Sequence, residues 1–349
     1  RHFPDLEGEL TALFDHLDDA LDGWLVKSEN YQALISLLPK HRGSMKAVYI
    51  DPPYNTATSE ILYINDYKES SWLTLMENRL AGTTPFLDHD GFLCITIDDF
   101  EIHKLKNLVE QVPGLEIVGT AAIKNSPSGR PTVRGFRINH EYAVFAARNK
   151  RVEIGTLDRS KEQMALYRET DEKGAFQWAN LRKRGGANTL RAARPKQFYP
   201  IYVLSDRIRI PRLKWDKEKG DWTILDQPEN EETVVYPIGD DGKERIWALG
   251  HDTARKQLSD LQVRRRNGSV YVFRKLYLTA TGSLPSTWWD KPKYFTVENG
   301  TGLLERVLGT YQAFPFPKSV YAVEDCLRVA GVYGKARVLD FFAGSGTTA

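Results

Sequence analysis

The chain has 349 residues, a formal net charge of +2 at pH 7 and 41% hydrophobic residues. At about 150 residues a domain, this length predicts roughly two domains with enough apolar side chains for a large core. No apolar run approaches the ~20 residues of a membrane span, and we expect neither a span nor a signal peptide. The two cysteines, Cys94 and Cys326, lie in apolar patterns. This favours buried thiols over a disulfide and is typical of a cytoplasmic protein.

The first 150 residues alternate between helical and strand patterns. The expected elements are helices over 6–25, 31–38, 71–87 and 101–112, and strands over 45–50, 92–97, 115–124 and 142–147. Strands that alternate with helices predict an α/β fold with a doubly wound, mainly parallel sheet. Asp98 and Asp99 lie between a strand and a helix, where we expect a helix N-cap.

The tetrad Asp51-Pro52-Pro53-Tyr54 directly follows the apolar run 45–50, so it should lie at the carboxyl end of a strand, where α/β sheets bind ligands. An exocyclic amine of an aromatic ring is a poor nucleophile, and Asp51 can accept its hydrogen and stabilise the developing cation. Successive prolines have no N–H and should turn the Pro52 carbonyl outward as a second acceptor. Tyr54 offers a face for a base to stack on, worth roughly 1–3 kcal/mol. The alternative is an ordinary proline turn after a strand.

A glycine turn, Phe342-Ala343-Gly344-Ser345-Gly346, follows a second expected strand over 336–341. We interpret it as a turn that holds S-adenosylmethionine; the alternative is a plain strand-to-helix turn. It lacks the lysine of a phosphate-binding P-loop, and no Cys/His array suits zinc, so we expect no metal. An amine-activating tetrad and a cofactor turn in one chain suggest a methyltransferase.

The middle of the chain, 151–298, is rich in tryptophan, short strand-like runs and turn signals such as Asn267-Gly268. Two clusters of basic residues stand out in it, which are Arg182, Lys183, Arg184, Arg191, Arg194 and Lys196 in one and Arg264, Arg265 and Arg266 in the other. Such side chains can neutralise DNA phosphates, and arginine can read guanine edges, although runs of charge are often only solvated surface. The polar stretch 125–139 predicts either a loop that closes over substrate or a plain connection.

The two motifs resemble those of a known family. IDPPYNT (50–56) and LDFFAGSGTTA (339–349) are similar to motifs IV and I of the β-class amino-methyltransferases of DNA, in which the catalytic motif comes first. The sequence between them resembles the modification subunits of type III restriction-modification systems and related adenine methyltransferases. The matching segments are GSMKAVYIDPPYNT, SSWLTLMENRL, GFLCITIDDFE, INHEYAVFA, RPKQFYPIYV and FPFPKSVYAVEDCL.

The resemblance implies a Rossmann-like doubly wound methyltransferase sheet with permuted motif order and an inserted, strand-rich target recognition domain. The implied domains are a catalytic half over 1–150, the recognition domain over 151–298 and a truncated cofactor half over 299–349. Because the chain stops at Ala349, inside the helix that the cofactor motif should open, we expect a fragment of a longer protein.

Site residues follow from matching positions. The resemblance makes Asp51, Pro52, Pro53 and Tyr54 catalytic, and it assigns the cofactor to Asp340, Phe341, Phe342, Gly344 and Gly346, with Asn30 and Lys318 beside it. For Asn30 and Lys318 the alternative is a helix cap or a surface residue. His140-Glu141-Tyr142 lies in the region that receives the extruded base, where Tyr142 would stack on the base or fill the core. The basic clusters would bind DNA.

The implied reaction is methyl transfer from S-adenosylmethionine to the 6-amino group of adenine at a specific DNA sequence, after base flipping. Cytosine members of the family usually have serine in place of the first aspartate, so Asp51 favours adenine. The alternatives are a cytosine-amino or RNA methyltransferase, or a noncatalytic DNA-recognition subunit. The implied partners are double-stranded DNA, a second modification subunit and a restriction helicase-nuclease. The alternative is a solitary methyltransferase or one that belongs to a different defence system.

Overall fold

The computed structural model describes residues 21–55, 69–129, 135–149, 151–279, 282–311 and 314–349. The chain forms two compact units, Arg1–Asp158 with Gly282–Ala349, and Arg159–Thr281. The second unit is shorter than the segment 151–298, because residues 288–289 pair with the sheet of the first unit. Residues 6–20 of the helix expected over 6–25 lie outside the described residues. Residues 21–25 are described and are not helical.

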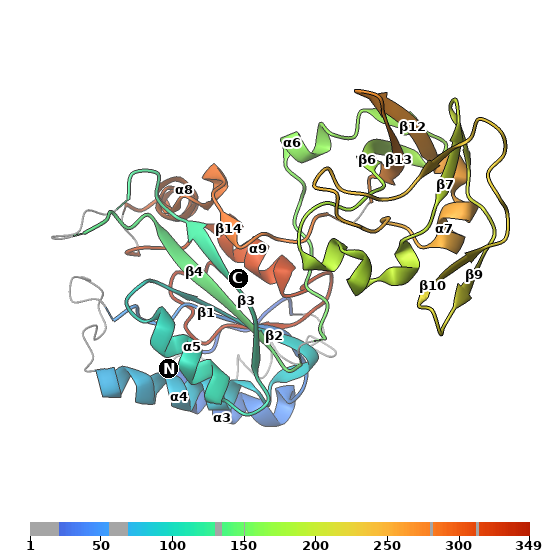
Figure 1. The fold of residues 1–349 in the computed structure, drawn as a ribbon. Helices are drawn as coiled ribbons and strands as arrows, with labels where there is room; N and C mark the ends of the chain where they lie inside the picture. The colour runs from blue at the N-terminus through green and yellow to red at the C-terminus, as the bar shows by residue number, and fades with distance from the viewer. Residues whose placement is uncertain (1–20, 56–68, 130–134, 150, 280–281, 312–313) are drawn as a thin grey trace, which may run out of the picture. The chain divides into compact units, whose positions relative to one another are not determined.

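The first unit is built on a six-stranded sheet (Figure 1) with the order β14-β3-β4-β2-β1-β15. Its strands are β1 (Met45–Ile50), β2 (Leu87–Ile97), β3 (Glu116–Lys124), β4 (His140–Ala147), β14 (Trp288–Trp289) and β15 (Val338–Leu339). Three of the pairings are parallel, whereas β4 runs antiparallel to both β2 and β3. The predicted α/β fold with a mainly parallel sheet is confirmed. The exception arises because Asn125 N donates to Asn139 O, so the chain returns from β3 directly into β4.

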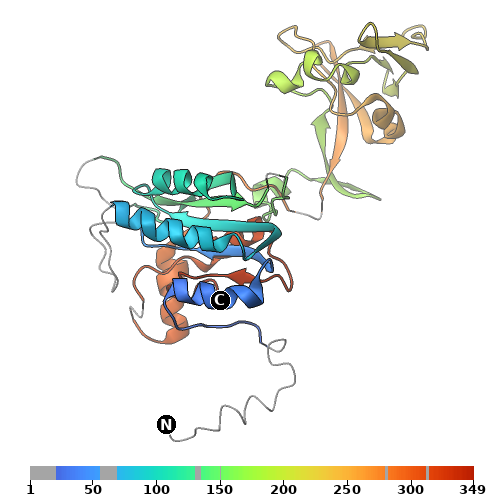
Figure 2. The same ribbon diagram turned by 90° about the horizontal axis from the view of Figure 1, so that it is seen from below.

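Helices cover both faces of this sheet. They are α3 (Asn30–His41), α4 (Glu69–Thr83), α5 (Ile102–Gln111), α8 (Gly302–Leu308) and α9 (Val320–Val329), with short turns η5 (Pro292–Tyr294) and η6 (Val297–Thr301). Side chains alternate along a strand: Val48 and Ile50 pack with Trp72 of α4 on one face, while Tyr49 packs with residues of α9 on the other. Seen from below, α3 and α4 lie in front of the sheet (Figure 2).

Both cysteines are free and buried, as predicted, and they belong to the cluster on the α9 face. Within the described ranges, no helix combines the length and the apolar character that a bilayer crossing requires.

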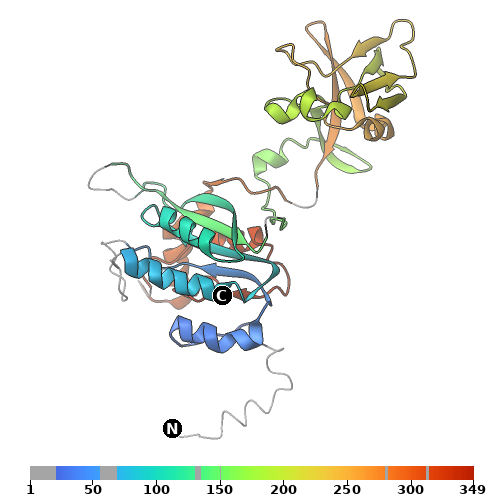
Figure 3. The same ribbon diagram turned by 60° about the horizontal axis from the view of Figure 1, so that its bottom comes forward.

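The second unit is rich in short antiparallel strands (Figure 3), as the sequence predicts. Its strands are β5 (Glu169–Asp171), β6 (Gly174–Asn180), β7 (Ile201–Leu204), β8 (Arg207–Arg209), β9 (Leu213–Asp216), β10 (Asp221–Ile224), β11 (Thr233–Val235), β12 (Leu261–Arg266) and β13 (Ser269–Tyr277). Its helices are α6 (Lys161–Met164), α7 (His251–Lys256) and the 3-10 turns η1 (Ala187–Thr189), η2 (Arg191–Ala193), η3 (Pro195–Gln197) and η4 (Leu258–Asp260). Trp247 and Tyr199 lie in a core of its own. Asn267 and Gly268 both have positive φ and join β12 to β13, which confirms the predicted hairpin tip.

Candidate active site

Asp51 is the first residue after β1, and one of its oxygens is held by two donors. Thr96 on the neighbouring strand β2 donates to Asp51 Oδ1 at 2.8 Å, and Lys318 Nζ lies 3.2 Å from the same oxygen. The Asp51 side chain is 28% exposed. Burial raises the pKa of Asp51, the charge of Lys318 opposes this rise, and the charge of Glu141 adds to it. The carboxylate is therefore oriented and poised as an acceptor at the sheet edge.

The proline loop is fixed from both sides. Trp72, fully buried on α4, donates from Nε1 to the Pro53 carbonyl at 2.9 Å. Asn55 has a φ of 55°, a left-handed conformation that asparagine tolerates, and its Nδ2 donates to Glu101 at 2.8 Å. The Pro53 carbonyl is therefore engaged within the fold.

Four side chains from distant parts of the sequence meet behind this loop, and we call Asp51, Tyr54, Glu141 and Lys318 the loop cluster. Tyr54 donates to Glu141 Oε2 at 2.9 Å, and Lys318 Nζ donates to the same oxygen at 2.6 Å. The Lys318 ammonium also contacts the Tyr54 hydroxyl and lies 4.3 Å from the centroid of its ring. Lys318 and Glu141 are 11% and 4% exposed, so their charges are compensated mainly within the cluster.

The protonation states in the loop cluster follow from burial and charge. Burial alone would lower the pKa of Lys318, but the carboxylates of Asp51 and Glu141 outweigh it and raise that pKa. Burial, with the charges of Asp51 and Glu141, raises the pKa of Tyr54 well above its usual value. Lys318 is therefore charged and Tyr54 neutral at neutral pH.

The cofactor motif lies beside the tetrad because β15 pairs in parallel with β1, with Ala47 opposite Val338. Asp340 Oδ1 accepts from Phe342 N at 2.9 Å, and Asp340 Oδ2 accepts from Thr348 Oγ1 at 2.7 Å. Burial raises the pKa of Asp340 to about 6, and the nearby charge of Asp51 contributes to this rise. The structure thus brings the two motifs to one edge of the sheet.

The glycine turn leaves its backbone accessible. Gly344 and Gly346 have φ of 55° and 76°, where any other residue would be strained, and a Cβ at Gly346 would meet no atom within 4 Å. Phe341 and Phe342 pack against the same core cluster as Tyr54. A turn without side chains at its two glycines, next to the half-buried carboxylate of Asp340, fits a ligand that carries positive charge.

Asn30 supports this turn from α3. Its Nδ2 donates to the Phe341 carbonyl at 3.3 Å, and its Oδ1 accepts from Arg79 at 2.8 Å. The alternative role of helix cap belongs instead to Glu29, whose carboxylate accepts from two backbone N–H groups of α3. Lys318 contacts the other three members of the loop cluster. Its expected role beside the cofactor stays a prediction.

The two aspartates after β2, Asp98 and Asp99, do not cap the helix that follows. Asp98 accepts from Phe100 N, but α5 begins only at Ile102 after Glu101, so the predicted N-cap by Asp98 or Asp99 is wrong. Asp99 instead accepts from the Tyr142 hydroxyl at 2.8 Å. Burial and this hydrogen bond raise the pKa of Tyr142 to about 12.

Sequence reasoning did not assign roles to Thr96, Trp72 or Glu141. Glu141 follows the loop 125–139, in a region that the family resemblance links to the base pocket, but no local pattern indicates that it bonds Tyr54 and Lys318. Trp72 is part of a helix and reads as core. Only the assembled sheet shows that all three hold the proline loop.

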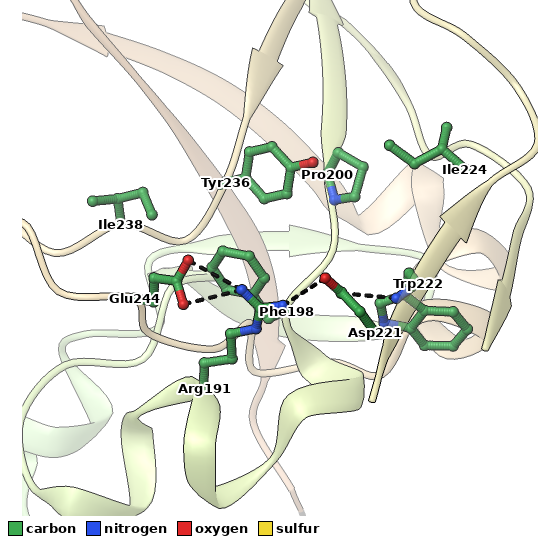
Figure 4. Close-up of a pocket in the computed structure, with 9 residues that line it drawn as sticks. All are labelled: Arg191, Phe198, Pro200, Asp221, Trp222, Ile224, Tyr236, Ile238 and Glu244. Atoms are coloured by element: carbon green, nitrogen blue, oxygen red, sulfur yellow. Dashed lines mark hydrogen bonds and ion pairs between the residues drawn. The ribbon is translucent and has the colours of Figure 1, made fainter. Parts of the chain in front are cut away.

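Two of the predicted DNA-binding residues are engaged within the second unit. Arg182 is buried and contacts both Asp240, at 3.0 Å, and the Ile238 carbonyl. Arg191 lies between Asp221, at 2.7 Å, and Glu244, at 3.0 Å (Figure 4).

Arg191 also stacks on an aromatic side chain. Its guanidinium lies 4.3 Å from the ring of Phe198, which stacks on Tyr236. These side chains line a pocket of about 320 Å³ whose further walls are Pro200, Trp222, Ile224 and Ile238 (Figure 4). The two charges beside Arg191 are thus used to hold the arginine in place.

The other predicted DNA-binding residues are exposed, and they are Lys183, Arg184, Arg194, Arg264, Arg265 and Arg266. Arg265 donates to the Ser205 carbonyl at 2.6 Å, and the guanidinium of Arg264 lies 4.5 Å from the ring of Phe273. The β12–β13 hairpin therefore presents basic side chains on an ordered scaffold.

Comparison with known proteins identifies the family. The chain is 30% identical over 362 residues to the type III restriction-modification enzyme EcoPI Mod subunit of Escherichia phage P1, covering 93% of this chain and 54% of that protein. It is 29% identical to the type II methyltransferase M.KpnI of Klebsiella pneumoniae, covering 86% of this chain and 69% of that protein. The crystal structure of the M1.HpyAVI-SAM complex matches 38% of this chain and 58% of its own at 16% identity and a TM-score of 0.28. A family model described as DNA methylase matches residues 45–349, so this chain belongs to that family, N6_N4_Mtase.

Proposed function

We propose that this chain is the methyl-transferring part of a restriction-modification enzyme, which modifies the 6-amino group of adenine at a specific DNA sequence. The observation that carries the proposal is the pairing of β1 with β15, which places the Asp51 acceptor and the Asp340 turn at one sheet edge. The chain spans about half the length of the phage Mod subunit that it matches.

The tetrad would bind and orient the amine. Asp51 accepts one amino hydrogen and the Pro52 carbonyl the other, and the negative charge of Asp51 stabilises the positive charge that develops on the nitrogen. Tyr54 offers its ring to the flipped base, and its hydroxyl is tied to Glu141, which fixes the plane of the ring. The resemblance on Asp51, where cytosine-modifying relatives usually carry serine, supports adenine as the target.

The glycine turn would hold S-adenosylmethionine, which supplies an electrophilic methyl group. Gly344 and Gly346 allow the cofactor to approach the backbone, and Asp340 offers a carboxylate to its cationic end. Asn30 keeps the turn in place through the Phe341 carbonyl.

The second unit would recognise DNA through its exposed basic side chains, with Arg264, Arg265 and Arg266 at the β12–β13 hairpin as the first candidates. Arg182 and Arg191 would instead shape the unit. The similarity to the phage Mod subunit supports a second modification subunit and a restriction subunit as partners, and a cytoplasmic location.

The decisive experiment compares Asp51→Ala with wild type. Unmodified bacterial genomic DNA is incubated with the intact protein and labelled S-adenosylmethionine, and the modified nucleosides are identified by mass spectrometry. We expect N6-methyladenine with wild type and at least a thousandfold loss with Asp51→Ala, while calorimetry shows retained cofactor binding. Asp90→Ala is the control, because Asp90 lies in the half of β2 remote from the site and is 48% exposed. Full activity of Asp51→Ala, or N4-methylcytosine as the product, would refute the assignment.

A further inference from the structure

We propose that Lys318 and Glu141 act together as positioning residues of the amine-binding loop: Lys318 holds the Asp51 carboxylate, and Glu141 offsets the charge that Lys318 brings. This inference rests on the proposed methyl transfer and deepens it. It also reassigns Lys318, which the family resemblance places with the cofactor.

The contacts described for Lys318 lie within the loop cluster. Its ammonium lies 3.2 Å from Asp51 Oδ1, donates to Glu141 Oε2 at 2.6 Å and contacts the Tyr54 hydroxyl. Because Thr96 donates to the same oxygen of Asp51, Oδ2 keeps its acceptor capacity for the amine. Lys318 and Thr96 thus fix the orientation of the acceptor before substrate arrives.

The charges explain why Glu141 is needed. During transfer the amine gains positive charge, and a buried ammonium beside Asp51 would oppose this if it stood alone. Glu141, 4% exposed and hydrogen-bonded to Lys318, cancels that charge. With Tyr54 neutral, the loop cluster keeps one net negative charge, and it is available to the amine. Hydrogen bonds from both Tyr54 and Lys318 to Glu141 also fix the plane of the Tyr54 ring.

Among the residues that the structure describes, five titratable groups interact electrostatically with Asp51. Lys318 and Glu141 come from the segment before α9 and from β4, Tyr54 from the loop itself, Tyr49 from β1, and Asp340 from the turn after β15. Burial raises the pKa of Tyr49 and of Tyr54 well above the usual value, so both stay neutral, and Asp340 ionises near pH 6. Changes at Lys318 and Glu141 should therefore move the ionisation of Asp51 in opposite directions.

The test compares Lys318→Met, Glu141→Gln, their combination and Lys318→Arg, with the intact protein, unmodified genomic DNA and labelled S-adenosylmethionine. Lys318→Met leaves the carboxylates of Asp51 and Glu141 together without the ammonium, so the acidic limb of the kcat profile should move to higher pH, with at least a tenfold loss at pH 7. Glu141→Gln should move that limb to lower pH and also reduce kcat at least tenfold. The double variant restores the net charge and should exceed Lys318→Met at least fivefold, while Lys318→Arg keeps the wild-type limb.

Cofactor affinity separates positioning from cofactor binding. Calorimetry should give a Kd for S-adenosylmethionine within twofold of wild type in every variant. The matched control is Arg328→Met, since Arg328 also pairs with two carboxylates, Asp158 and Glu324, but at the surface of α9, and its kcat should not change.

The outcomes are distinct. If wild type transfers no methyl group, the proposed function fails and takes this inference with it. If wild type is active, only the inference is overturned by the following result: the loss of kcat in the double variant equals the product of the two single losses, and the acidic limb moves in neither Lys318→Met nor Glu141→Gln. A tenfold weaker cofactor Kd in Lys318→Met with unchanged kcat would return Lys318 to the cofactor. If Lys318→Met does not fold, two other variants still test the inference. It is overturned if Lys318→Arg loses the acidic limb of the wild-type pH profile. It is also overturned if the kcat of the double variant is no higher than that of Glu141→Gln.

Discussion

Asp340 should make stability depend on pH in a direction opposite to that of most carboxylates. Burial raises its pKa to about 6 from the ordinary value of 3.8. A carboxyl that binds its proton more tightly in the folded state contributes stability fully below the unfolded pKa, and this contribution is lost as pH rises through the folded pKa. With 1.36 kcal/mol per pKa unit, the loss between pH 4 and pH 7 is roughly 2 kcal/mol.

Asp340→Asn isolates this effect, because the amide cannot titrate but its oxygen can still accept from Phe342 N. In urea unfolding between pH 4 and pH 7, the free energy of wild type minus that of the variant should fall by roughly 2 kcal/mol as pH rises. Calorimetry should show that wild type binds S-adenosylmethionine more weakly below pH 6, since a protonated Asp340 loses its attraction for a cation. A stability difference that stays constant across this range would show that the carboxyl is not perturbed.

Further predictions concern the supports of the site and the DNA-binding unit. Trp72→Phe removes the donor to the Pro53 carbonyl and should lower the free energy of urea unfolding by about 1–3 kcal/mol; an unchanged midpoint would mean that this bond contributes nothing. Asn30→Ala should weaken cofactor binding by about 1–2 kcal/mol in calorimetry, with kcat retained at saturating cofactor, and a lost kcat would contradict a purely supporting role. Arg266→Ala should make the negative slope of log DNA affinity against log salt shallower by about 0.9. Arg182→Ala should instead lower the melting temperature, because the buried Arg182 pairs with Asp240. If Arg182→Ala changed only the salt dependence of DNA binding and Arg266→Ala only the melting temperature, the roles assigned to these two residues would be wrong.

The sequence predicts five of the six strands of the first sheet, because they are short, continuous apolar runs. It does not predict β14, which has only two residues and lies in a segment that we expected to belong to the middle domain. The predicted ends of the elements are less accurate. For example, α4 ends at Thr83 and not at residue 87, because Pro85 disfavours a helical conformation in the residue before it. The strand expected over 336–341 shortens to Val338–Leu339, since Asp340 turns the chain by accepting from Phe342 N. The antiparallel direction of β4 could not be predicted, because the hydrophobic pattern of a strand indicates burial and not direction.

The two motif loops could be predicted to meet, since both follow parallel strands. The partners of those loops could not. Glu141 and Lys318 are 177 residues apart, and no local pattern around either residue indicates that they form a pair. Arg182 belongs to a basic run, yet it is buried because Asp240 and the Ile238 carbonyl, more than 50 residues later, receive it. Long-range polar pairing of this kind leaves no periodicity to detect.

The distance of 264 residues between Tyr54 and Lys318 also sets when the site can exist during synthesis. A ribosome completes the proline loop early, but the lysine that holds its carboxylate emerges only after the whole second unit, which has a core of its own and can fold in the meantime. In a nascent chain, the contacts between Lys318 and the proline loop can therefore form only after translation has passed residue 318, which lies just before α9. A chain that ended before Lys318 would leave the Asp51 carboxylate without the ammonium that holds it.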